Sequence, residues 1–155
     1  MSAFEFRKNI IIKTSGLNQL ERRTVMKLKT LLIIKAAVCL CLGLSILIAP
    51  DFIYSIFGAA LAAGGAFAAR EYAASIMGNL MLTWFARNSQ ESDARWAIVL
   101  ALCVYDAVGF IVTLIAMFTG VLNSLGWLIV LLYLFFAVGF GYFLIPRKSP
   151  AIEAK

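Results

Sequence analysis

The chain has 155 residues, of which 63% are hydrophobic and 14% are charged, and its formal net charge is +6. Its mean hydropathy of +0.92 excludes an ordinary soluble domain, which is closer to half apolar and a quarter charged. The chain has no histidine, which removes the usual zinc ligand and the usual general base near neutral pH.

Residues 1–27 form a polar, basic arm. The net positive charge lies entirely in residues 1–35, which a role in membrane topology explains more simply than nucleic-acid binding, so no nucleic-acid partner is expected. The spacing from Leu17 to Leu28 suits a short amphipathic helix on the membrane surface, and a loosely ordered tail is the alternative. The arm would dock on a neighbouring protein or on anionic lipid through Arg7, Lys8, Lys13, Arg22 and Arg23.

The first apolar block predicts a membrane-crossing helix over 28–49, close to the ~20 residues that a bilayer crossing needs. Lys35 is interpreted as an anchor that snorkels from this helix toward the basic side. An uncleaved signal anchor is favoured over a signal peptide, because the apolar stretch is long and no good small-x-small cleavage site follows before Pro50. Pro50 ends the helix, and the aromatic segment after it is predicted to lie along the outer membrane surface.

Three further crossings are predicted over 66–86, 96–118 and 125–145. The apolar block before the first of these is longer than one crossing, so that helix is tilted or its first turns run along the interface. Ser92 or Asp93, in the polar connector, can cap the next helix. The predicted fold is therefore all-α: a basic arm, a four-transmembrane-helix bundle over 28–146 and a cytoplasmic tail over 147–155.

Charge predicts the orientation of this bundle. Lys and Arg outside the predicted crossings lie in the arm, in the connector 87–95 and in the tail. The connector after Pro50 and the turn 120–124 hold no basic residue. By the positive-inside rule both termini are cytoplasmic, and we expect a multi-pass protein of a bacterial inner membrane.

Arg70, Glu71, Tyr105 and Asp106 form a candidate intramembrane polar cluster. Asp106 lies near mid-membrane, where an unpaired charge is costly, and Arg70 on the neighbouring helix is its expected partner, with Tyr105 or Tyr72 as alternatives. Such a cluster is either an interhelical ion pair that fixes register or a pocket for a polar head group, a quinone or a transported proton. Glu71 either belongs to it or faces water at the outer interface.

Small residues recur in and just before the second predicted crossing, as in Ala62-xxx-Ala66 and Ala69-xxx-Ala73. This spacing favours close helix contact within the bundle or against a partner. The last predicted helix instead carries bulky aromatic residues all round, which suits lipid, a long-chain cofactor or a larger subunit.

No catalytic or metal-binding motif is present in the sequence, and an enzyme is not expected. Cys39, Cys41 and Cys103 all lie in apolar blocks and are interpreted as small buried apolar residues, so neither a disulfide framework nor a metal site is predicted.

From about Met26 to Arg147 the chain resembles a broad group of small bacterial four-helix membrane proteins that carry no assigned activity. The features that carry this resemblance are Arg70…Gly78, Arg87…Arg95, the run Gly120-Val121-Leu122-Asn123-Ser124-Leu125-Gly126-Trp127 and the ending Gly139-Phe140-Gly141-Tyr142-Phe143-Leu144. The resemblance implies the four-helix architecture and leaves the function open.

These patterns favour a non-catalytic accessory or scaffolding subunit that packs against a larger membrane protein complex and membrane lipids. The alternative is a small transporter or binding protein with a polar intramembrane pocket at Arg70 and Asp106. No cofactor is predicted, and a quinone or another lipid-like ligand stays open as an occupant of the pocket.

Overall fold

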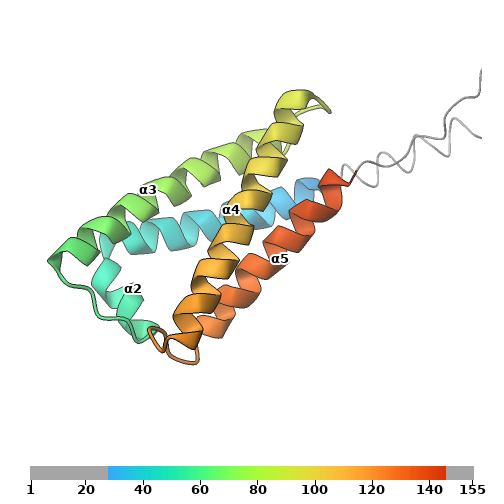
Figure 1. The fold of residues 1–155 in the computed structure, drawn as a ribbon. Coiled ribbons are helices and arrows are strands. Elements are labelled where there is room, and N and C mark those ends of the chain that lie inside the picture. Colours follow the sequence, from blue (N-terminus) through green and yellow to red (C-terminus); the bar gives the residue numbers. More distant parts are fainter. Residues whose placement is uncertain (1–27, 146–155) are drawn as a thin grey trace, which may run out of the picture.

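The computed structural model describes residues 28–145, without the side chain of Ala63. Within this range every regular element is a helix (Figure 1). The candidate docking residues of the arm (Arg7, Lys8, Lys13, Arg22 and Arg23) and the predicted tail lie outside the described residues. The helices are the first helix (Leu28–Ile48), α2 (Pro50–Ile56), α3 (Ala63–Ala86), α4 (Asp93–Phe118) and α5 (Gly126–Leu144).

The first helix, α4 and α5 are long and apolar enough to cross a membrane, which indicates a membrane protein. α3 is also long, with 24 residues, but it is not among these three. It contains Arg70, Glu71 and Asn79 together with several glycines, all of which lower its hydropathy. The predicted bundle of four crossings thus depends on the assignment of α3.

The long helices form two hairpins (Figure 1). The first helix lies beside α3, and α4 packs along α5. α2 and the α4–α5 turn meet at one end of the molecule, where the backbone N–H of Asn123 donates to the carbonyl of Phe57 at 2.8 Å. The side-chain amide of Asn123 also donates to the carbonyl of Ile56 at 2.8 Å. The turn between the second pair of helices is therefore fastened to the end of α2.

Helix boundaries follow from capping. Ser92 is the N-cap of α4, because its hydroxyl accepts a hydrogen bond from the backbone N–H of Arg95 at 3.2 Å. The helix consequently starts before the predicted residue 96. Pro50 does more than end the first helix: it begins α2, since proline is well suited to the first position of a helix.

Two apolar clusters form the core. One joins the first helix to α3 through closely packed small and branched side chains: Ala36, Cys39, Ile46, Ala69, Ala73, Ile76 and Leu80. The other, at the end of the molecule opposite α2, brings together side chains from the first helix, α3, α4 and α5: Leu28, Leu31, Leu32, Ala86, Val99, Leu102, Phe136 and Phe140. The second cluster therefore holds the two hairpins together at that end.

α4 and α5 pack closely at Gly109. A Cβ added there would lie 2.5 Å from Cε1 of Tyr133, so only glycine fits against this ring. The ring of Tyr133 is thereby held in place by the backbone of α4.

We expect Gly109→Ala to destabilise the protein by about 1–3 kcal/mol, because the added methyl group overpacks the contact with Tyr133. Unfolding in detergent micelles, followed by circular dichroism, measures the change. Gly64→Ala is the matched control, since a Cβ at Gly64 meets nothing within 4 Å. Equal stability of the two variants would contradict the packing argument.

Candidate functional site: a buried polar centre

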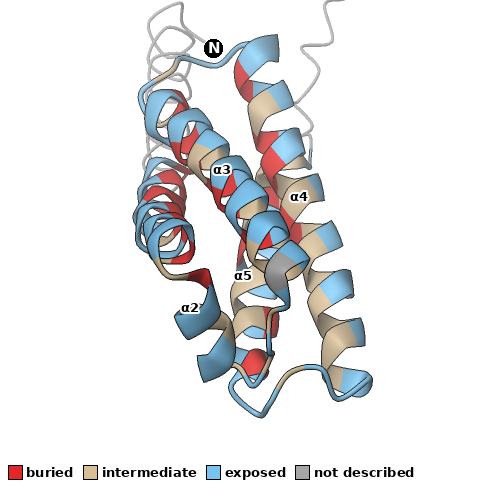
Figure 2. Cartoon of the chain, turned by 90° about the vertical axis from the view of Figure 1, so that its left-hand side faces the viewer, coloured by how far each residue is buried: buried red, intermediate tan, exposed pale blue. Residues whose placement is uncertain are grey.

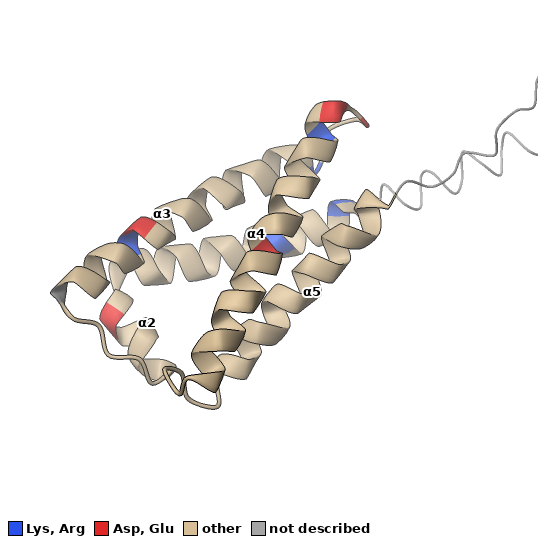
Figure 3. Cartoon of the chain, viewed as in Figure 1, with Lys and Arg blue, Asp and Glu red and all other residues tan. Residues whose placement is uncertain are grey.

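A buried ion pair connects the two hairpins. The ammonium Nζ of Lys35, on the first helix, donates to Oδ1 of Asp106 on α4. The two residues are 71 positions apart and expose only 4% and 0% of their surface. Figure 3 shows charged positions of opposite sign meeting where α4 passes the first helix. Asp106 is therefore paired, but not with the residue that the sequence suggested.

The expected pairing of Asp106 with Arg70 is wrong. Arg70 and Glu71 are exposed on α3, whose inward face is instead formed by Ala69, Ala73 and Ile76. The structure thus separates Arg70 and Glu71 from Tyr105 and Asp106 and does not gather the four residues into one cluster.

The interpretation of Lys35 as a snorkelling anchor is also wrong. Its side chain is buried and points into the bundle. Leu28, Leu32 and Cys39 are also buried, and their spacing of three to four residues around Lys35 places all of them on one helix face. This periodicity was the sequence signal for an inward-facing lysine.

Aromatic rings surround the ammonium of Lys35. Its Nζ lies 4.5 Å from the ring centroid of Phe136, 5.5 Å from that of Tyr105 and 5.9 Å from that of Tyr133. The negative ring faces attract a cation at such distances, most strongly where water is excluded. The carboxylate of Asp106 and these rings together replace the water that an exposed lysine would bind.

Tyrosine hydroxyls extend the centre to α3 and α5. The hydroxyls of Tyr72 and Tyr133 form a hydrogen bond that connects these two helices. The Tyr133 ring in turn lies 6.4 Å, centroid to centroid, from that of Tyr105. On α2, burial raises the pKa of the Tyr54 phenol, and interaction with Tyr72 raises it further.

We define the polar centre as Lys35, Tyr72, Tyr105, Asp106 and Tyr133. These side chains come from the first helix, α3, α4 and α5, so each long helix contributes at least one. The sequence identified Tyr105 and Asp106 as candidates and offered Tyr72 as an alternative partner. It missed Tyr133, which no local pattern distinguishes from the other aromatic residues of α5.

Two polar atoms of the centre have no hydrogen-bond partner among the described residues. They are the hydroxyl of Tyr105 and the second carboxylate oxygen, Oδ2, of Asp106, and both are buried. A buried polar atom left in this state costs about 1–3 kcal/mol. These atoms provide unused hydrogen-bonding capacity inside the bundle.

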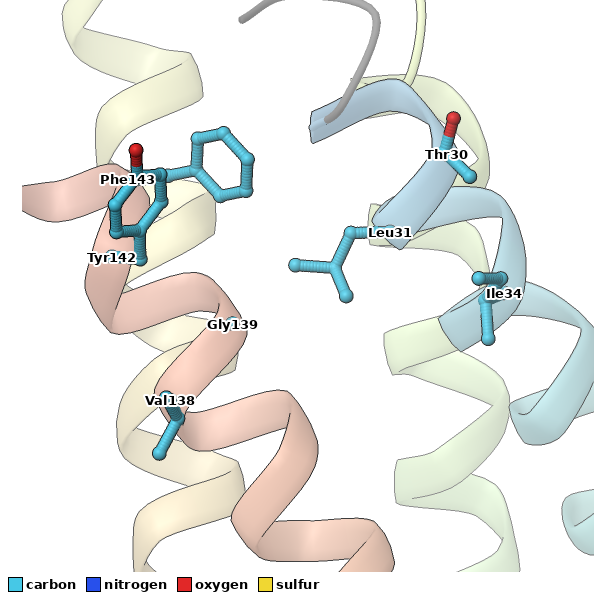
Figure 4. Close-up of a pocket in the computed structure, with 7 residues that line it drawn as sticks. All are labelled: Thr30, Leu31, Ile34, Val138, Gly139, Tyr142 and Phe143. Atoms are coloured by element: carbon cyan, nitrogen blue, oxygen red, sulfur yellow. The ribbon is translucent and has the colours of Figure 1, made fainter.

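Two surface pockets lie away from this centre. An open, mostly apolar groove of about 410 Å³ separates the first helix from α5 (Figure 4). Leu31 and Phe143 face each other across it. A second pocket of about 290 Å³ lies at the start of α4, beside Glu91 and Arg95. No residue of the polar centre lines either pocket.

The cysteines do not form a site in the described part of the chain. Cys39 is buried and Cys103 is half-buried, but Cys41 is exposed, which corrects the expectation that all three are buried. Over residues 28–145, no three His, Cys, Asp or Glu side chains lie close enough together to bind a metal ion.

Comparison with known proteins gave no match: no family model, no curated protein and no solved structure matches this chain. The resemblance to small bacterial four-helix membrane proteins therefore stays a prediction.

The ion pair should stabilise the contact between the first helix and α4. Asp106→Leu alone leaves the charge of Lys35 buried and unpaired, and we expect it to destabilise the protein by about 3–5 kcal/mol. Adding Lys35→Met removes that charge and should restore most of the loss. A double-mutant cycle measured by unfolding in detergent tests this coupling. Additive effects of the two substitutions would contradict it.

Proposed function

We propose that this chain is a non-catalytic scaffolding or accessory subunit of a larger membrane protein complex. The observation that carries the proposal is the polar centre. Its side chains contact one another across the bundle, and none lines either of the two pockets described above. An enzyme needs reactive groups that a substrate can reach, whereas a buried ion pair and a tyrosine pair between helices serve to fix the arrangement of the helices.

The proposal includes four membrane crossings, with α3 as the fourth. The first helix ends at the α2 end of the molecule, and α4 starts at the opposite end (Figure 1). α3 must therefore cover the same distance as the apolar helices beside it, and its 24 residues are sufficient for a bilayer crossing.

The orientation follows from the distribution of charge. Lys29, Arg87 and Arg95 lie at the end of the molecule where α3 gives way to α4, whereas Asp51 lies on α2 at the other end. The positive-inside rule then places the former end, with both termini, in the cytoplasm of a bacterial cell. The arm would extend from this end toward a cytoplasmic neighbour or anionic lipid.

The outer surfaces of α4 and α5 suit such a role. Both helices expose large apolar side chains along their length, among them Val104, Val108, Ile111, Val112, Ile115, Leu128, Leu131, Phe135 and Val138. These surfaces would contact membrane lipid and the apolar helices of a larger subunit.

Purification of a tagged chain in mild detergent, with mass spectrometry of the co-purified proteins, tests the scaffolding role. We expect a reproducible set of membrane partners at fixed stoichiometry. Asp106→Leu should reduce their recovery, because it disturbs the bundle, and the addition of Lys35→Met should restore it. A chain that purifies without other proteins would contradict the proposal.

A second candidate function, binding or transport within the membrane, is favoured by the unpartnered Tyr105 hydroxyl and Asp106 Oδ2. A transported proton or the polar head of a quinone or another lipid-like ligand could use these atoms, and an intramembrane carboxylate is a common element of proton pathways. The groove between the first helix and α5 is apolar enough for a lipid chain.

Proton flux into liposomes that contain the purified chain tests this second candidate. If it is correct, Asp106→Asn should abolish the flux and Tyr105→Phe should reduce it. Asp51→Asn, at an exposed aspartate of α2, is the control and should leave the flux unchanged. Flux no greater than that of empty liposomes would rule out proton transport.

A further inference from the structure

The outward face of α3 is mixed: the exposed side chains of Phe67 and Phe85 suit lipid, but a charged pair between them does not. Figure 2 shows its exposed side running along the molecule opposite the buried face. Arg70 and Glu71 both lie on the exposed side, and neither forms an ion pair with another described residue. Charged side chains in a membrane-spanning helix normally have a partner, because their isolation in lipid is costly. A partner from outside this chain's described fold would compensate both charges.

The turns that follow this pair along α3 carry small, exposed residues. Ala74, Ser75 and Gly78 are all exposed on α3. A Cβ added at Gly78 would meet no atom within 4 Å, so nothing in residues 28–145 covers this position. Small residues let the backbone of another helix approach closely in lipid. A helix seated here would also come within reach of Arg70 and Glu71.

The two charges of this face can pair with the same two charges on a second copy of the chain. Two copies in one membrane with the same topology are related by a two-fold axis parallel to the membrane normal, so equivalent residues lie at equal depth. Arg70 and Glu71 are consecutive and differ in depth by only ~1.5 Å. Arg70 of each copy can therefore face Glu71 of the other, which forms two reciprocal ion pairs. A partner that offers only one charged group here would leave either Arg70 or Glu71 unpaired.

We propose that the outward face of α3, defined by Arg70, Glu71, Ala74, Ser75 and Gly78, binds a second copy of this chain. The two α3 helices then lie side by side, with the small residues in contact and the charges paired across the two-fold axis. This interface rests on the membrane crossing of α3 that is part of the proposed function. It does not depend on the scaffolding role, because a dimer can form without any other subunit.

Charge exchange tests the reciprocal pairing. The full chain is reconstituted in lipid bilayers at several protein-to-lipid ratios, and its dimer fraction is measured by single-molecule photobleaching. Arg70→Glu alone and Glu71→Arg alone each place like charges across the axis and should weaken dimerisation at least about tenfold. The combined variant, R70E with E71R, restores opposite charges and should recover the dimer.

The helix contact has its own matched test. Ala74→Leu places a large side chain on the proposed interface and should also weaken the dimer, whereas Ala101→Leu makes the same change on the exposed side of α4 and should not. The proposal would be overturned if the wild-type chain stays monomeric. It would also be overturned if neither the charge variants nor Ala74→Leu changes the dimer fraction. When the chain is instead purified in mild detergent, loss of a different co-purified subunit, rather than of the dimer, in the charge variants would also overturn it.

Crosslinking keeps the test independent of the stability of the charge variants. Ser75→Cys, in a chain whose exposed Cys41 is replaced by serine, should form an intermolecular disulfide in bilayers under mild oxidation. Ala101→Cys in the same background is the control and should stay uncrosslinked. Equal crosslinking at both positions, or none at Ser75→Cys, counts against the interface.

Discussion

The burial of one positive and one negative charge in an apolar bundle is the constraint on which this structure depends. Lys35 and Asp106 are on helices of different hairpins, and each is tolerated in the interior only because the other is present. The first helix and α4 are thus fixed in both depth and rotation. Purely apolar side chains, which pack acceptably in several registers, would not fix them to this degree.

Different kinds of contact hold different parts of the molecule. Small residues, Ala69 and Ala73 among them, allow α3 to lie close to the first helix. α4 and α5 are joined by the fit of the Tyr133 ring against Gly109. Tyr133 also bonds to Tyr72 of α3, so one side chain takes part both in forming a hairpin and in connecting the two hairpins. Tyr133 therefore makes both the hydrogen bond between the hairpins and the close packing within one of them.

The helices could be predicted from the sequence because the length of an apolar block reports on a bilayer crossing. The partner of Asp106 could not be predicted from depth alone, since Arg70 and Lys35 both lie within reach along the membrane normal. The rotation of each helix about its own axis decides which of the two faces inward. The spacing of the buried residues Leu28, Leu32 and Cys39 identifies the face on which Lys35 lies. Tyr133 was beyond prediction, because its role depends on the contact of α5 with α3, which are distant in sequence.

The hydrogen bonds of Asn123 to the end of α2 have a consequence for how the molecule can move. The two hairpins are connected at one end by these bonds, in the middle by the polar centre and at the other end by the apolar cluster around Phe136 and Phe140. With connections at three levels, neither end can act as a hinge about which the other swings open. The hairpins would have to separate along their whole length at once, so the loss of their contact is expected to be cooperative.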